Sequence, residues 1–117
     1  MSTTLEIGSR REGSEAGVLS LKGEVDVANA HQVRDAALKL VSEGVRLLVV
    51  DLSGIEYMDS AGLGVLVAIH KRLREQGGSL AVAGPQPRVG RLFEITGLSQ
   101  VFAVREDAAA ALKEVGG

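Results

Sequence analysis

The segment from residue 51 to residue 69, DLSGIEYMDSAGLGVLVAI, contains the side chains whose chemistry is most informative in this 117-residue chain. Ser60 is placed where the sequence predicts that a loop turns into a helix, and the small residues Ala61 and Gly62 leave its hydroxyl accessible to another protein. Asp59 precedes it, where the helix dipole favours a negative charge. Serine and aspartate are also common N-cap residues. Two interpretations therefore stand: a helix cap, or an exposed serine that another protein recognises.

Neither histidine can complete a catalytic triad with this serine, because triad groups must lie within hydrogen-bond reach of one another. His70 is on the same predicted helix as Ser60 but about 15 Å further along its axis. His31 falls on the polar face of an earlier predicted helix, as a solvated surface residue would. The chain has no cysteine and no Gly-x-Ser-x-Gly motif. We expect no catalytic residue, no enzyme activity, no metal site and no cofactor.

Composition argues against nucleic-acid and membrane binding. The formal net charge is −2 and aromatic residues make up 3%, so the chain offers neither a basic surface nor a set of rings for stacking bases. The longest apolar stretches, residues 47–50 and 63–69, fall short of the roughly 20 residues that a spanning helix needs. The first residues, MSTTLE, do not read as a signal peptide. We expect a cytoplasmic protein without membrane insertion.

The elements that must position these residues alternate along the chain. We expect strands over residues 5–11, 17–22, 46–52, 80–83 and 101–104, helices over 29–42, 60–76, 88–96 and 106–115, and a loop over 53–59. Either Asp26 or Asn29 can cap the first helix. Residues 47–50 are apolar without alternation, which is typical of a strand covered on both faces. The order predicts one α/β domain with a mixed, largely parallel sheet of about four to five strands and helices packed on it.

The predicted helix over 60–76 is apolar on more sides than one core can bury. Its apolar residues in the first half are Leu63, Val65, Leu66, Val67 and Ile69. Either this half is sandwiched between other elements, or Leu63 and Gly64 form part of an exposed docking patch.

Four segments together resemble one known family. Residues 59–64, DSAGLG, are similar to the phosphorylation-site motif of STAS domains, in particular of bacterial anti-sigma factor antagonists. Residues 23–26, GEVD, resemble the family's segment after its second strand, residues 48–52 its central strand, and residues 91–98, RLFEITGL, its third-helix signature. The resemblance covers about residues 5–112 in the expected order. It implies that the whole chain is one STAS domain, 1–117, with its core in that range.

The resemblance implies a protein that switches between partners. Such antagonists bind an anti-sigma factor that is also a serine kinase, which frees the sigma factor. Phosphorylation of the motif serine, here Ser60, ends the interaction, and a phosphatase restores it. The chain departs from many members in having Ala61 where they have a second serine or threonine, which leaves Ser60 as the single acceptor. The implied partner-binding positions are Glu24, Asp26, Asp59, Ala61, Gly62, Leu63 and Gly64, in a monomer or weak dimer.

Two alternatives remain at this point. A STAS-domain regulatory subunit of a membrane transport system would share the fold but would bind a transporter component. A small enzyme or nucleotide sensor would have to use residues 62–64, GLG. That sequence is an incomplete dinucleotide-binding fingerprint, because the third glycine position is Val67 and the preceding strand is expected to end about ten residues earlier.

Overall fold

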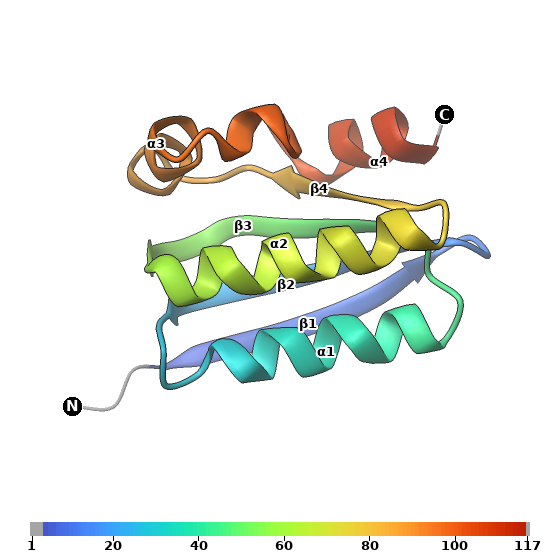
Figure 1. Ribbon diagram of the computed structural model, residues 1–117, viewed down its shortest axis with the longest axis horizontal. Coiled ribbons are helices and arrows are strands. Elements are labelled where there is room, and N and C mark those ends of the chain that lie inside the picture. The colour runs from blue at the N-terminus through green and yellow to red at the C-terminus, as the bar shows by residue number, and fades with distance from the viewer. Residues whose placement is uncertain (1–3, 117) are drawn as a thin grey trace.

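The computed structural model describes residues 4–116 and folds them into a five-stranded sheet with helices packed on it (Figure 1). Residues 1–3 and 117 of the expected domain lie outside the described residues. The strands are β1 (Leu5–Glu12), β2 (Ala16–Val25), β3 (Leu47–Met58), β4 (Ser79–Ala83) and β5 (Ala103–Arg105). The helices are α1 (Ala30–Ser42), α2 (Ser60–Glu75), α3 (Pro87–Ile95) and α4 (Ala108–Gly116), with a short 3-10 helix at Leu98–Gln100.

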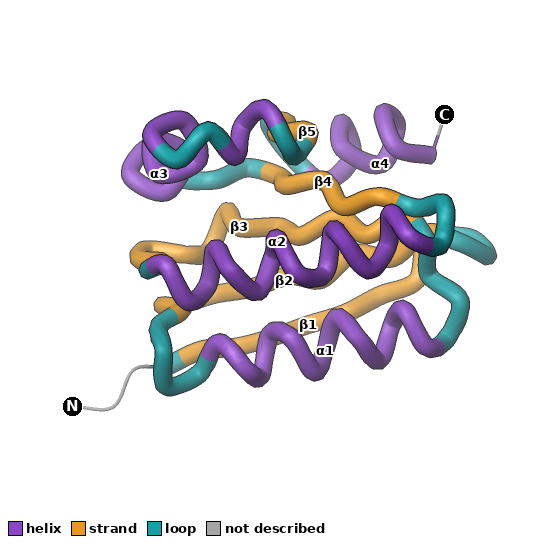
Figure 2. The backbone as a smooth tube through the Cα atoms, in the orientation of Figure 1, coloured by secondary structure: helices purple, strands orange, loops and turns teal. Residues whose placement is uncertain are grey.

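The strands lie in the spatial order β1-β2-β3-β4-β5. β1 and β2 form an antiparallel hairpin, and every later neighbour is parallel. Parallel neighbours need a crossover connection, and the chain provides one helix between each parallel pair (Figure 2). The predicted mixed, largely parallel α/β sheet is confirmed.

The two faces of the sheet are covered by different helices. Leu48 and Val50 of β3 belong to the large core that α1 and α2 complete on one face. Val49, which alternates with them, packs on the other face in a smaller cluster with Ala111 of α4. Side chains of a strand alternate between faces, so burial on both sides requires the continuous apolar sequence seen at 47–50.

The expected loop over residues 53–59 is wrong for most of its length. β3 continues to Met58 and stays paired with β2, from Lys22 opposite Gly54 to Val25 opposite Met58, with two register irregularities. Ser53-Gly54 resembles a turn in sequence, but Gly54 marks a close approach of two strands instead. A Cβ at position 54 would lie 3.0 Å from the carbonyl oxygen of Leu21.

The last expected strand, residues 101–104, is shifted. The 3-10 helix at Leu98–Gln100 delays it, and β5 begins at Ala103. α1 begins at Ala30 after Asn29, and Gly44 follows it with φ of +103°, a left-handed conformation that glycine adopts readily after a helix.

His70 joins α2 to β4. Its Nδ1 accepts a hydrogen bond from the backbone N–H of Leu80 at 3.2 Å, and its ring packs edge-on against Phe102 with 5.2 Å between ring centres. Burial, and to a lesser degree the nearby Arg74 cation, lowers the pKa of His70 below its usual 6.5. The neutral ring is therefore the form that the fold requires, since a protonated Nδ1 cannot accept this bond.

The free energy of unfolding is expected to depend on pH through His70. Its pKa is lower in the folded chain, so the contribution is complete above about pH 6.5 and is lost progressively as the pH falls from there through the folded pKa. Urea unfolding between pH 7.5 and 5.5 measures this slope. His70→Gln should flatten it, because glutamine does not titrate in this range. Equal slopes in wild type and His70→Gln would contradict the assignment.

Candidate functional site

At the start of α2, the helix cap and the candidate phosphate acceptor are two different residues. Asp59 is the N-cap residue, and its Oδ1 accepts hydrogen bonds from the backbone N–H groups of Ala61 at 2.9 Å and Gly62 at 3.3 Å. Ser60 is the first residue of the helix, exposed, and its hydroxyl takes no part in these capping bonds. Of the two residues that could have capped the helix, Asp59 is the one that does. The Ser60 hydroxyl is left available for chemistry with another protein.

The carboxyl ends of β2 and β3 meet beside this serine. Val25 pairs with Met58, and the backbone N–H of Asp59 donates to the carbonyl of Val25 at 3.2 Å. This pairing brings the exposed Glu24, and Asp26 just after it, to the same end of the sheet as Ser60. Figure 1 shows the first turns of α1 and α2 at this same end of the molecule. Crevices at the carboxyl ends of parallel strands are where open α/β sheets commonly bind ligands.

The turn that carries Asp26 is held by its own side chains. Asp26 Oδ1 accepts from the backbone N–H groups of Ala28 at 2.9 Å and Asn29 at 3.2 Å. Asn29 is only 6% exposed; its Oδ1 accepts from the Asp26 N–H and its Nδ2 donates to the carbonyl of Glu24, both at 3.0 Å. Asn29 thus fixes the turn to the end of β2 and makes no side-chain cap on α1. The sequence indicated a cap for this residue and gave no signal of its inward orientation.

The remaining motif residues divide between core and surface. Leu63 is 7% exposed and packs in the main core, so the interpretation of its side chain as part of an exposed apolar patch is wrong. Gly62 is buried, Ala61 is half-buried and Gly64 is exposed. Val65 and Val67 are half-buried against the core, which accounts for a helix that is apolar on several sides.

A Cβ at Gly62 would lie 2.7 Å from the Cγ of Met58 and 3.0 Å from Cγ1 of Val25. Only glycine lets the first turn of α2 sit this close to the paired strand ends. A Cβ at Gly64 would meet no atom within 4 Å. Gly62 therefore positions Ser60, whereas Gly64 has no such packing requirement.

Two exposed apolar side chains at this end were not predicted. Val27, next to Asp26, is 80% exposed, and Tyr57, opposite Glu24 in the strand register, is 45% exposed. A sequence pattern cannot distinguish them from core residues, because Val27 follows a buried strand and Tyr57 lay in the expected loop.

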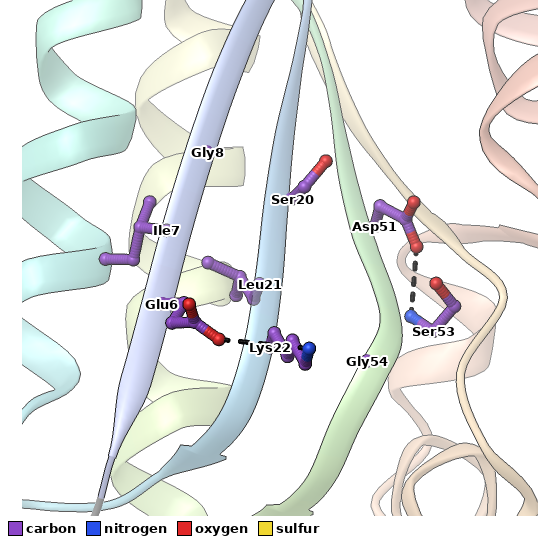
Figure 3. Close-up of a pocket in the computed structure, with 9 residues that line it drawn as sticks. All are labelled: Glu6, Ile7, Gly8, Ser20, Leu21, Lys22, Asp51, Ser53 and Gly54. Atoms are coloured by element: carbon purple, nitrogen blue, oxygen red, sulfur yellow. Dashed lines mark hydrogen bonds and ion pairs between the residues drawn. The ribbon is translucent and has the colours of Figure 1, made fainter.

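A polar groove of about 480 Å³ crosses β1, β2 and β3 away from this site (Figure 3). In this groove the Nζ of Lys22 lies 4.0 Å from the Oε2 of Glu6. The Oδ1 of Asp51 accepts a hydrogen bond from the backbone N–H of Ser53 at 2.9 Å. Its lining includes none of the predicted site residues. Among the described residues, no group of three or more histidine, cysteine or carboxylate side chains could hold a metal ion. No helix in residues 4–116 has the length and apolar content to cross a membrane.

Comparison with known proteins agrees with the fold. The STAS domain family matches residues 10–111. A Bordetella bronchiseptica protein named anti-sigma factor antagonist BtrV is 39% identical over 99 residues, covering 82% of this chain and 85% of that protein. The anti-sigma-B factor antagonist of Listeria monocytogenes is 43% identical over 84 residues, covering 71% and 73%. The crystal structure of an anti-sigma factor antagonist from Mycobacterium paratuberculosis superimposes with a TM-score of 0.88 at 26% identity, covering 97% and 96%.

The fold and the family match define a single α/β domain of a known family. The chain belongs to the STAS domain family. Its relatives at 39% and 43% identity carry the name anti-sigma factor antagonist.

Proposed function

We propose that this chain is an anti-sigma factor antagonist, a cytoplasmic regulatory protein and not an enzyme. Its unphosphorylated form binds an anti-sigma factor that is also a serine kinase, and this binding frees a sigma factor. Phosphorylation of Ser60 by that kinase ends the interaction, and a phosphatase restores it. The observation that carries the proposal is the exposed Ser60 hydroxyl at the first residue of α2, free of the capping role that Asp59 fills.

The binding surface in this proposal lies around Ser60. It combines the carboxylates of Glu24, Asp26 and Asp59 with the exposed side chain of Val27 and the open backbone at Gly64. The small residues Ala61 and Gly62 leave Ser60 sterically accessible to a partner. Leu63 packs in the core beneath this surface. Acidic groups around an apolar residue fit a partner surface with complementary positive charge.

The electrostatics of the cap support the switch. A phosphate adds about −1.5 to −2 charge at neutral pH. The first-turn amides that would neutralise an anion are those of Ala61 and Gly62, and they already bind the Asp59 carboxylate. The phosphate therefore adds its negative charge to that of Asp59 and does not replace the Asp59 carboxylate on these two amides. The solvated chain tolerates this charge, but burying it unpaired in an interface costs several kcal/mol.

Phosphate mapping tests the site. The chain is incubated with the candidate kinase and ATP, and the modified peptide is identified by mass spectrometry, with Ser60→Ala as the control. We expect one phosphate, on Ser60, and none on the variant. Recovery of the phosphate mainly on Ser53, Thr96 or Ser99 would overturn the assignment. No modification by any sigma-regulating kinase, together with binding to a transporter component, would favour the transport-system alternative.

Asp26 is expected to act in partner binding and phosphotransfer beyond its role in the turn. Asp26→Asn keeps an Oδ1 that can accept from Ala28 and Asn29 but removes the charge. The unfolding free energy should change by less than about 0.5 kcal/mol, while partner affinity falls about tenfold, as expected for removing one interfacial charge. Thermal melting, calorimetry with the partner and the phosphorylation rate measure the three effects. Affinity and rate equal to wild type would make the residue purely structural.

A further inference from the structure

The free edge of the sheet is formed by β1, an eight-residue strand whose outer side has no strand partner among the described residues. The backbone N–H of Glu24 donates to the carbonyl of Thr4 at 3.1 Å, so Thr4 and Glu24 are a hydrogen-bonded pair of the antiparallel ladder. Such pairs alternate along the ladder. The amides and carbonyls of Leu5, Ile7, Ser9 and Arg11 therefore point outward, where they can pair with another strand.

The side chains of β1 alternate in the same register. Leu5 and Ile7 pack against the core on the face that α1 and α2 cover. Glu6 and Gly8 line the polar groove on the opposite face (Figure 3), and Arg10, two residues further, shares that face. A strand that pairs with this edge must present matching side chains on each face.

We infer that the β1 edge is a pairing surface for the β1 strand of a second copy of this chain, in antiparallel register with Gly8 opposite Gly8. The two copies are related by a two-fold axis perpendicular to the sheet. Each residue of one strand then faces the residue of the second copy for which the two residue numbers add up to 16, so that residue 7 faces residue 9. Ile7 then forms a hydrogen-bonded pair with Ser9 of the second copy, as the outward backbone groups require. Glu6 faces Arg10 of the second copy twice, once on each side of the axis, as a close, non-hydrogen-bonded pair. Within one chain Arg10 Nε donates to the exposed Glu12 Oε1 at 2.7 Å and Lys22 Nζ lies 4.0 Å from Glu6 Oε2, so self-pairing adds Glu6 of the second copy to the partners of Arg10.

The charges distinguish this register from its neighbour. Shifting the two strands so that Ser9 faces Ser9 also uses the outward backbone groups. It places Glu6 opposite Glu12 twice, however, and like charges directly opposite are destabilising. Shifting the strands the other way, so that Ile7 faces Ile7, also uses the outward backbone groups, but it places Glu6 opposite Gly8 and forms no ion pair. The charges of β1 therefore favour the register with Gly8 opposite Gly8. Few apolar side chains are added to the contact, so the dimer is weak, and it leaves Ser60 exposed at the start of α2.

Single-cysteine trapping tests the register directly, because the chain has no cysteine of its own. A Cβ at Gly8 meets no atom within 4 Å, so Gly8→Cys is accommodated. Cα atoms of a close antiparallel pair are about 4.5 Å apart, within the range that a disulfide spans. We expect Gly8→Cys to form a disulfide dimer under mild oxidation at least about tenfold faster than the control Ser9→Cys. Faster trapping of Ser9→Cys, or equal slow trapping of both variants, would overturn the inferred register.

Sedimentation measures the same association without a crosslink. Arg10→Glu replaces both attractive pairs with repulsive ones, and the neighbouring register with Ser9 opposite Ser9 still places Glu6 opposite Glu12. We therefore expect this variant to raise the dimer dissociation constant at least about tenfold. Ser60→Asp should leave the constant unchanged, because that residue is outside the contact. A wild-type chain that stays monomeric at millimolar concentration, or Arg10→Glu with unchanged association, would contradict the inference. Neither experiment involves the anti-sigma partner, so the outcome is independent of the proposed function.

Discussion

Ser60→Asp is expected to weaken binding to the anti-sigma partner by at least about 100-fold, whereas Ser60→Ala should bind within about threefold of wild type. The aspartate places a permanent charge beside Asp59, whose carboxylate already occupies the amides of Ala61 and Gly62. An unpaired charge that is buried in an interface costs several kcal/mol, and about 2.7 kcal/mol corresponds to 100-fold in affinity. Calorimetric titration of each variant into the partner measures the difference.

The matched alanine variant separates charge from loss of the hydroxyl. Ser60 makes no capping bond, so Ser60→Ala should not lower stability, and alanine is the better helix former. A melting temperature equal to or slightly above that of wild type is expected for Ser60→Ala. Equal partner affinity of the alanine and aspartate variants would refute the electrostatic account of the switch.

Gly62→Ala is expected to destabilise the chain, because overpacking costs about 1–3 kcal/mol. The higher helix propensity of alanine offsets part of this cost. The added methyl would lie 2.7 Å from the Cγ of Met58 and 3.0 Å from Val25. Both neighbours are buried side chains at the paired ends of β2 and β3, so neither can move aside at low cost. Denaturant unfolding gives the change in free energy.

Gly64→Ala is the matched control on the same helix turn. No atom lies within 4 Å of its new Cβ, so the substitution should stabilise the chain by roughly 0.5–1 kcal/mol through helix propensity alone. If Gly64 belongs to the partner surface, the same variant binds the anti-sigma factor less tightly although it is more stable. Destabilisation by Gly64→Ala exceeding that of Gly62→Ala would contradict the packing assignment.

Periodicity and local chemistry predicted most of the fold. The helices over 29–42 and 60–76 followed from apolar spacing and from capping and glycine signals, and the structure confirms both within one residue. The buried strand expected over 46–52 begins as expected, but it continues to Met58. The parallel sheet followed from their alternation. The meeting of Asp26 with the start of α2 required only that the second and third strands be neighbours, as they are.

Errors arose where tertiary packing overrides a local pattern. Ser53-Gly54 has the composition of a turn, but pairing with β2 keeps it extended. For Leu63 the local pattern left two alternatives, burial between elements or part of an exposed patch, and the structure shows burial in the main core. The inward orientation of Asn29 depends on the carbonyl of Glu24, a contact that no local sequence pattern specifies.

Release of a sigma factor is the central claim, and one assay measures it. A fluorescently labelled sigma factor in complex with its anti-sigma factor is titrated with this chain, unmodified or phosphorylated on Ser60, and release is followed by anisotropy. We predict stoichiometric release by the unmodified chain and no release by the phosphorylated chain at the same concentrations. Equal release by both forms would contradict the switch at Ser60, and release by neither would contradict the assignment as an anti-sigma factor antagonist.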